Sequence, residues 1–155
     1  MAIIEKRHYE PLIDDPDDYR PNSQLALLAD PESQDGAFVK EMSILFETCA
    51  PGDRIPLHTH PIEEVIVIEE GEAEVSLGDE RQTVGGGGVI FIPTGVAHGL
   101  RNAGEANLRL LAVFSSTTIS LQYLNRNPAP GTEGNAPQPP VSIDVHEYQR
   151  SVDAR

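Results

Sequence analysis

The chain has 155 residues and a formal net charge of −14, because 25 Asp and Glu residues outnumber 11 Lys and Arg residues. This length fits one domain that can bury a core, and the negative charge excludes nucleic acid and anionic membrane surfaces as natural partners, since both would be repelled. Its 13 glycines and 13 prolines favour many short strands over long helices.

The chain opens without the apolar segment of a signal peptide, and no stretch approaches the length of a membrane span. The single cysteine, Cys49, excludes an intrachain disulfide and is expected to be a small buried apolar residue rather than a nucleophile. We therefore expect a soluble, cytoplasmic protein.

Residues 1–36 are predicted to form an acidic N-terminal extension, in which residues 14–18 are four aspartates around one proline. One short apolar stretch in this extension, Leu25 to Ala29, could pair as an edge strand or pack as a helical turn. The sequence alone leaves both alternatives open.

Residues 37–124 are predicted to form the core, an all-β sandwich or barrel. A first strand is indicated by the shared parity of Phe38, Met42, Ile44 and Phe46. Further strands are predicted at residues 65–69, 73–77, 81–84, 89–92, 108–114 and 119–124. Turn signals separate most of them at intervals of about 8 to 12 residues, a pattern typical of all-β folds. The four glycines at 85–88 precede a strand and lack the Lys of a phosphate-binding loop, so they indicate a strand-to-strand turn.

Residues 125–155 are predicted to form a Pro-rich C-terminal extension. Residues 125–140 contain five prolines and two glycines, a composition that excludes a helix or a central strand. The last part, from Val141 onward, could add a short strand or a docking segment.

Four residues have the chemistry and the spacing of metal ligands: His58, His60, Glu64 and His98. The first two lie two positions apart on an extended segment, so their side chains face the same side. Glu64 can join that face after a turn, and a closed or rolled sheet could bring His98 opposite. Three imidazoles and one carboxylate suit one divalent transition metal, which could be Fe, Mn, Ni, Co, Cu or Zn.

Other residues compete for this role less well. Glu63 neighbours the predicted ligand Glu64, but its alternate parity predicts an outward face. His8 and His146 lie in the terminal segments, where exposed or packing roles are expected.

Two segments of the chain resemble the two conserved motifs of the cupin superfamily. In residues 52–71, the fixed positions of the first motif are occupied by Gly52, His58, His60, Glu64 and Gly71. In residues 87–102, those of the second are occupied by Gly87, Pro93, Gly95, His98 and Asn102. The resemblance implies an all-β fold, the double-stranded β-helix or jelly-roll barrel of a small single-domain cupin, over residues 37–124. The apolar residues expected in its core or lining are Ile66, Ile68, Val75, Leu77, Leu108, Leu110 and Phe114.

The resemblance implies a metal-dependent enzyme that acts on a small organic substrate bearing oxygen. Oxygen-dependent cleavage by a dioxygenase is the leading expectation, with a diketone, catechol or similar substrate. A redox-neutral sugar isomerase, lyase or decarboxylase is the alternative, and a non-catalytic cupin that binds a small ligand is the other, because a fold does not name a reaction.

Neither the general acid and base nor the assembly is determined by these motifs. Arg54 could sit at the barrel mouth, and Tyr123 and Glu47 could face the cavity. Each is expected to be a surface or wall residue, so no catalytic residue is assigned. Because the edges of a sheet invite pairing, we expect a homodimer in which a terminal segment packs on the partner or covers an edge.

The ligand assignment predicts which histidines control metal content. His58→Ala or His98→Ala should cut bound metal strongly, since each removes one of only four protein ligands. Elemental analysis of the purified variants measures this. His8→Ala and His146→Ala are the matched controls and should leave metal content unchanged, so loss of metal in the His146 variant would contradict the assignment.

Overall fold

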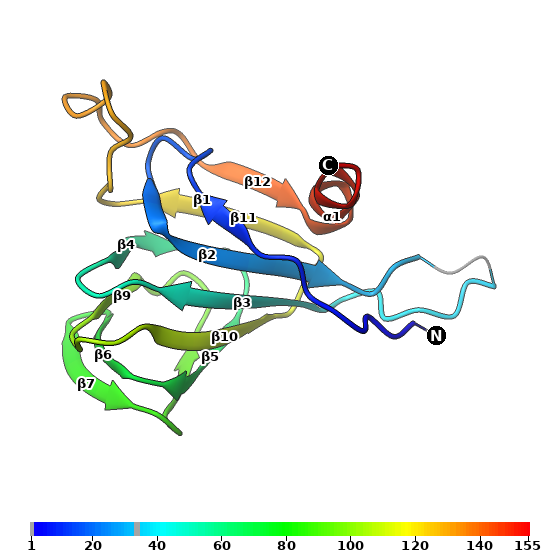
Figure 1. The fold of residues 1–155 in the computed structure, drawn as a ribbon, viewed down its shortest axis with the longest axis horizontal. Helices are drawn as coiled ribbons and strands as arrows, with labels where there is room; N and C mark the ends of the chain where they lie inside the picture. Colours follow the sequence, from blue (N-terminus) through cyan, green and yellow to red (C-terminus); the bar gives the residue numbers. More distant parts are fainter. Residues whose placement is uncertain (1, 33–34) are drawn as a thin grey trace.

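The fold consists of two antiparallel β-sheets that face each other, as drawn in Figure 1. It is given by a computed structural model that describes residues 2–32 and 35–155. Within these residues, 12 strands form the two six-stranded sheets, and one short helix follows them. The expectation of an all-β jelly-roll barrel is confirmed.

The first sheet has the strand order β1-β2-β3-β10-β5-β8. Its strands are β1 (Glu10–Leu12), β2 (Arg20–Ala29), β3 (Ser43–Cys49), β10 (Leu108–Phe114), β5 (Glu64–Glu70) and β8 (Val89–Ile92). The second has the order β12-β11-β4-β9-β6-β7. Its strands are β12 (Val141–Asp144), β11 (Thr118–Tyr123), β4 (Arg54–Thr59), β9 (His98–Asn102), β6 (Glu72–Leu77) and β7 (Glu80–Gly85).

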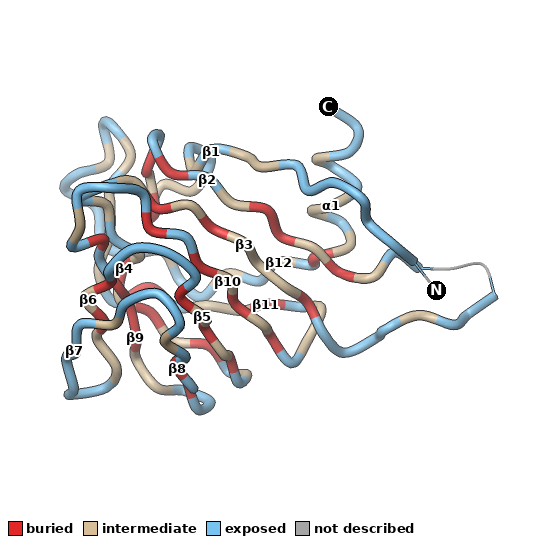
Figure 2. The backbone as a smooth tube through the Cα atoms, turned by 60° about the horizontal axis from the view of Figure 1, so that its bottom comes forward, coloured by how far each residue is buried: buried red, intermediate tan, exposed pale blue. Residues whose placement is uncertain are grey.

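The core lies between the two sheets and follows from the alternation of side chains along each strand. In β10, every second residue from Leu108 to Phe114 is buried, because successive side chains of a strand point to opposite faces. Figure 2 shows the buried positions on the inner strands of the molecule. The residues predicted for the interior are all found there, with Leu77 half-buried against the core and the other six buried.

The predicted strands are found with small shifts, but two details of the sequence pattern were misleading. The strand predicted to begin near Phe38 is β3, and it begins at Ser43. Its buried face carries Ser43, Glu47 and Cys49. The apolar residues Ile44 and Phe46 are only half-buried. Strand β9 was not predicted, because HGLRN has no apolar alternation and forms a strand only by pairing with β4 and β6.

The turns follow the glycines. Residues 86–88 connect β7 to β8, as the sequence predicts. Gly71 joins β5 to β6 with φ +94°, and a Cβ atom there would lie 3.1 Å from the Leu108 Cα atom. Only glycine tolerates both the positive φ and this close approach.

Both terminal segments contribute to the sheets. The stretch Leu25 to Ala29 is part of β2, so it is not a helical turn. It pairs with β3 along its whole length but with β1 only at Leu25, so most of it has one strand neighbour, as the edge-strand alternative predicts. At the other end, β12 pairs with β11 and leads into helix α1 (Val145–Asp153), which begins at the capping residue Asp144. The helix packs beside β2, where the Ala29 amide donates to the Gln149 side chain at 3.1 Å.

The helix α1, which is the one helix in the described part of the chain, has nine residues. Across residues 2–32 and 35–155, no helix reaches the length and apolarity that crossing a bilayer requires.

Candidate metal centre and cavity

The fold brings the four predicted ligands together. His58 lies on β4, His60 follows that strand, Glu64 starts β5, and His98 starts β9, where it pairs with His58. All four are buried, and one ligand atom from each lies within 4.8 Å of the others. The spatial meeting that the sequence predicted is therefore present, and the four residues could hold one metal ion.

Backbone carbonyl groups orient the three imidazole rings. The Nδ1 atoms of His58, His60 and His98 lie 2.6, 2.8 and 2.9 Å from the carbonyl oxygens of Pro56, Ser120 and Val96, respectively. Because a carbonyl oxygen can only accept, each Nδ1 carries the ring proton and donates it. Each Nε2 is then left with a free lone pair, which is the arrangement of a ring that ligates a metal.

The ligand atoms have the mutual distances of donors around one ion. The Nε2 atoms of His58 and His60 are 3.1 Å apart. The Glu64 Oε2 atom lies 2.8 Å from His98 Nε2 and 3.4 Å from His60 Nε2. Two ligands held at about 2.1 Å from a metal, at right angles to each other, are about 3 Å apart. Acceptor atoms this close repel each other unless a cation lies between them, so the donor set fits a divalent metal.

The electrostatics keep the imidazoles in their ligand form. Burial, reinforced by the neighbouring rings of His98 and His60, lowers the pKa of His58 to about 3. Burial also lowers the pKa of His60, even though Glu64 opposes the shift. Both rings are therefore neutral at physiological pH, and only the neutral ring binds a metal.

The cluster opens into a cavity of about 380 Å³ that lies between the sheets. Most of its wall is apolar, with contributions from Leu27, Leu45, Ile66, Leu110, Phe114 and Ile119. The terminal segments complete it, because residues 10–15 of the N-terminal segment and Ile143 and Tyr148 of the C-terminal segment also line it. A cavity of this size can enclose most of a small organic molecule.

The basic side chains of the cavity wall are each paired with a carboxylate. Among the described lining residues, Arg20 and Arg155 are the basic ones. Arg155 binds Glu10 at 3.0 Å near the surface. Arg20 binds Asp18 and Glu47. Other carboxylates, including those of residues 14 and 15, make the wall acidic, which disfavours phosphorylated or carboxylated substrates.

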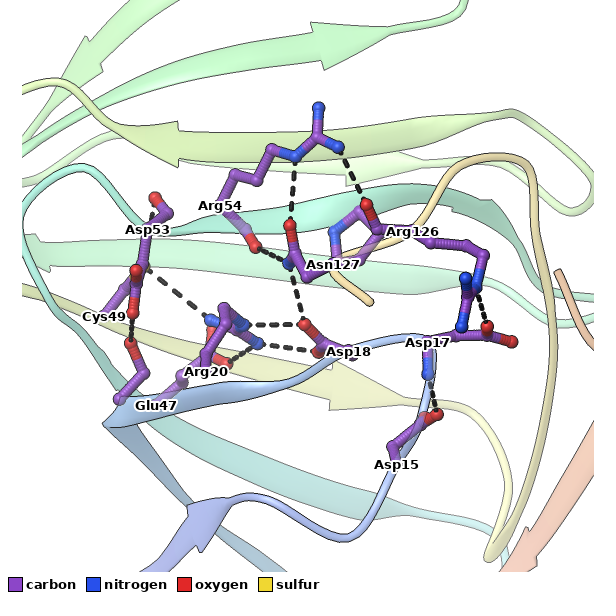
Figure 3. A network of polar contacts seen from close by, with 12 residues as sticks. Asp15, Asp17, Asp18, Arg20, Glu47, Cys49, Asp53, Arg54, Arg126 and Asn127 are labelled. Carbon is purple, nitrogen blue, oxygen red and sulfur yellow. Dashed lines mark hydrogen bonds and ion pairs between the residues drawn. The ribbon is translucent and has the colours of Figure 1, made fainter. Parts of the chain in front are cut away.

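The most buried ion pairs of the cavity centre on Arg20, as Figure 3 shows. Its guanidinium holds both oxygens of Asp18, at 2.7 and 2.9 Å, and Oε1 of Glu47 at 2.6 Å. Burial opposes the charge of Arg20, but these two carboxylates outweigh it and raise the pKa of the guanidinium. Asn127 donates to Asp18 at 3.0 Å and so fixes the network from its outer side.

One atom of this network has no hydrogen-bond partner among the described residues, namely Oε2 of Glu47. Glu47 is 3% exposed, and burial raises the pKa of its carboxyl group even though Arg20 opposes the shift. A buried polar atom without a partner destabilises a protein by about 1–3 kcal/mol, so such an atom calls for an explanation.

The remaining candidates from the sequence divide into two groups. Glu47 and Tyr123 line the cavity, and the Tyr123 hydroxyl donates to Asp15 at 2.5 Å. Arg54 lies outside it, where its side chain binds Asn127 and the Arg126 carbonyl (Figure 3). Glu63 is exposed, as its parity predicts.

The other histidines and the cysteine stand apart from the cluster. His8 is exposed, and His146 is half-buried with its Nε2 atom 2.9 Å from the Asp30 carbonyl oxygen. Cys49 is buried, and burial raises the pKa of its thiol to about 11, which leaves it an unreactive thiol. Asn102 donates to the carbonyls of Cys49 and Ala106, so its role is structural, as expected.

Sequence reasoning missed Asp18 and Arg20. Both lie in the segment that the sequence predicts as an extension, and both line the cavity. Arg20 begins β2, which pairs with β3, and Asp18 is held by Arg20 and by a bridge to Asn127. The available signal was an acidic run followed by an arginine, which is more common on a solvated surface than in a cavity wall.

Comparison with known proteins agrees with this fold and site. The model of the cupin domain family matches residues 45–114. Auxin-binding protein 1 from Arabidopsis thaliana is 30% identical over 92 residues, which cover 54% of this chain and 46% of that protein. Protein SCO3923 from Streptomyces coelicolor is 32% identical over 94 residues, which cover 57% of this chain and 89% of that protein. The matched region thus spans about half the length of auxin-binding protein 1 and most of SCO3923.

Two solved structures share the fold at low sequence identity. The polyketide cyclase RemF from Streptomyces resistomycificus has a TM-score of 0.59 and 23% identity, and the match covers 97% of this chain and 93% of that chain. A sugar phosphate isomerase of the cupin superfamily from Silicibacter pomeroyi has a TM-score of 0.55 and 18% identity, with 74% of this chain and 71% of that chain covered.

These findings define a jelly-roll fold with a buried cluster of three histidines and one glutamate. The chain belongs to the cupin superfamily, as a small single domain of that family.

The lowered pKa values of the cluster predict metal retention in mild acid. A free histidine, with a pKa near 6.5, is mostly protonated at pH 5.5 and loses its metal. In this protein His58 remains neutral there, because its pKa is about 3, and the pKa of His60 is also lowered. Metal content after dialysis should therefore be the same at pH 7.5 and pH 5.5. Release of most of the metal by pH 5.5, while the fold is intact by circular dichroism, would contradict this.

Proposed function

We propose that this protein is a metal-dependent enzyme that acts on a neutral, largely apolar organic substrate with two oxygens able to bind one metal ion. The observation that carries this proposal is the cavity itself. Its apolar wall leads to the cluster of His58, His60, Glu64 and His98, and its two arginines are both paired with carboxylates.

The four cluster residues would hold the metal, and their chemistry fits Fe, Mn, Ni, Co, Cu or Zn. When bound, such an ion supplies Lewis acidity that favours loss of a proton from an enol, a phenol or a 1,3-dicarbonyl compound. The carbonyls of Pro56, Ser120 and Val96 keep the imidazoles oriented for it. Apolar side chains around the cluster exclude water, which strengthens electrostatic interactions with the substrate.

Two reaction classes suit this substrate, and each has its own support. Oxygen-dependent cleavage by a dioxygenase is supported by the largely apolar cavity wall, which suits diketones, flavonols and catechols. These compounds are neutral, mostly apolar and rich in vicinal or 1,3-related oxygens. Redox-neutral ring closure is supported by the similarity to the polyketide cyclase RemF. That match covers 97% of the chain and so includes the terminal segments that line the cavity.

Sugar isomerisation, the other redox-neutral reaction, is disfavoured by charge. A sugar phosphate needs a cation or a set of amide donors to bind its phosphate. The acidic cavity wall offers neither an unpaired arginine nor a lysine among its described residues.

Turnover assays test the proposal and separate the two classes. The protein, loaded in turn with Fe, Ni, Mn and Zn, is assayed with aryl 1,3-diones, flavonols, catechols and linear poly-β-ketones, in air and under nitrogen. We expect turnover of at least one neutral substrate that falls at least about 100-fold in His98→Ala, which removes a ligand from the cluster, and is unchanged in the control His8→Ala.

Each possible function predicts a different outcome of these assays. Activity that stops under nitrogen supports the dioxygenase, whereas full activity of the Zn form under nitrogen eliminates it and supports ring closure, because Zn has no redox chemistry. Binding without any turnover would instead indicate a non-catalytic ligand-binding protein. Turnover of sugar phosphates but of no neutral substrate would contradict the proposal.

We also propose that the protein is a homodimer. Strand β8 is the outer strand of its sheet, and its residues Val89 and Phe91 are 50% and 71% exposed. A strand edge with exposed apolar side chains favours pairing with a second copy. Light scattering at micromolar concentration should give twice the mass of the chain, and Phe91→Glu should shift the protein toward monomer. A monomeric wild-type protein would contradict this.

A further inference from the structure

The unpartnered oxygen of Glu47 is the feature of the cavity that the metal cluster leaves unexplained. Oε2 of this carboxyl group is buried and has no hydrogen-bond partner among the described residues. The carboxyl group belongs to the wall of the same cavity that contains the histidine cluster.

The position of this carboxyl group is fixed from two sides. Its other oxygen, Oε1, accepts a hydrogen bond from Arg20 at 2.6 Å, and Arg20 is itself held by both oxygens of Asp18 (Figure 3). On β3, Glu47 pairs in register with Leu25 of β2 and Leu110 of β10, so its neighbours across the sheet are apolar. The carboxyl group is thus held at Oε1, and its apolar neighbours offer no side-chain donor to Oε2.

From this geometry we propose that Glu47 is a specificity residue, and that its Oε2 atom binds a hydroxyl group of the substrate at a second polar subsite of the cavity. This inference rests on the function proposed above and adds to it: the substrate carries a hydroxyl group beyond the two oxygens that face the metal cluster. A hydroxyl fits because it can donate to an ionised carboxylate and can also accept from a protonated one. Polyphenols and hydroxylated aromatic diones have this chemistry.

Arg20 and Asp18 are positioning residues in this arrangement. Arg20 holds Oε1 and leaves Oε2 for the substrate, while Asp18 and, through it, Asn127 hold Arg20. The arginine is thus part of the wall, because its Nε and Nη2 atoms bind the carboxylates of Asp18 and Glu47 and its Nη1 atom lies 3.7 Å from the Cys49 sulfur.

Calorimetric titration of the Zn-loaded protein with four matched ligands tests the subsite. The ligands are 1-phenylbutane-1,3-dione and its 2-, 3- and 4-hydroxyphenyl analogues, which differ only in one hydroxyl group. At least one hydroxylated analogue should bind the wild type about tenfold or more tightly than the parent dione, since a hydrogen bond to a charged group is gained. In Glu47→Leu this preference should vanish, so that the four diones bind this variant with similar affinities.

Two further variants keep the test decisive. Glu74→Gln, at an exposed position paired with Arg101, is the matched surface control and should keep the full preference. If Glu47→Leu does not fold, Glu47→Gln replaces it, since Gln keeps the volume and can still accept from Arg20. An amide NH₂ then stands where Oε2 was, and the preference should fall by about threefold or more, because a charged acceptor is lost.

Each other outcome overturns a defined part of the proposal. If the four diones bind the wild type equally, or if the preference persists in Glu47→Leu, the hydroxyl subsite is wrong while the proposed substrate class stands; an ordered water would then be the partner of Oε2. If none of the four diones binds, the substrate class is wrong and the subsite is wrong with it.

Discussion

The pairing of β4 with β9 is the constraint on which the candidate site depends. It sets His58 directly opposite His98, two residues that are 40 positions apart in the sequence. The other two cluster residues then need only local geometry, because His60 continues the extended segment and Glu64 follows one turn later. Backbone carbonyls of β4, of β11 and of the turn before β9 accept the Nδ1 protons, so the ring orientations follow from the positions of these elements. Four lone pairs converge at one point as a direct result of strand register.

The surroundings of the cluster narrow the chemistry that it can support. A metal held by three imidazoles and one carboxylate is compatible with oxygenases, isomerases, lyases and cyclases alike, so the ligands cannot select a reaction. The cavity wall is more selective. It is apolar over most of its area and acidic where it is polar, and its arginines are paired. This combination is the basis of the proposed preference for neutral substrates that bind through enol, phenol or keto oxygens.

The N-terminal and C-terminal segments form part of the cavity wall. Strands β1 and β2 add to one sheet and β12 to the other, and α1 packs beside β2. Partly buried hydrogen bonds connect the two terminal segments: Asp17 binds Arg126 and the Gln138 amide, and Asn127 binds Asp18. The hydrogen bonds from Gln138 and Arg126 outweigh the effect of burial and lower the pKa of Asp17, which keeps this carboxylate charged. These segments carry Asp18 and Arg20 into the cavity, so they decide the polar part of its wall.

The sequence by itself determined the all-β class, most strand positions and the four cluster residues. The period-two pattern and the turn glycines are local properties. The four cluster residues are marked by two cupin-like motifs, each of which is readable without knowledge of the contact that brings the motifs together. The tertiary structure alone decided that β9 is a strand, that Glu47 and not Phe46 faces the interior, and that Asp18 and Arg20 belong to the cavity wall. In each case the deciding interaction joins segments far apart in the chain. From sequence alone, a Glu or Arg is predicted to be a surface residue, because burying a charged side chain without a partner is unfavourable. Only the folded chain brings these charged partners together.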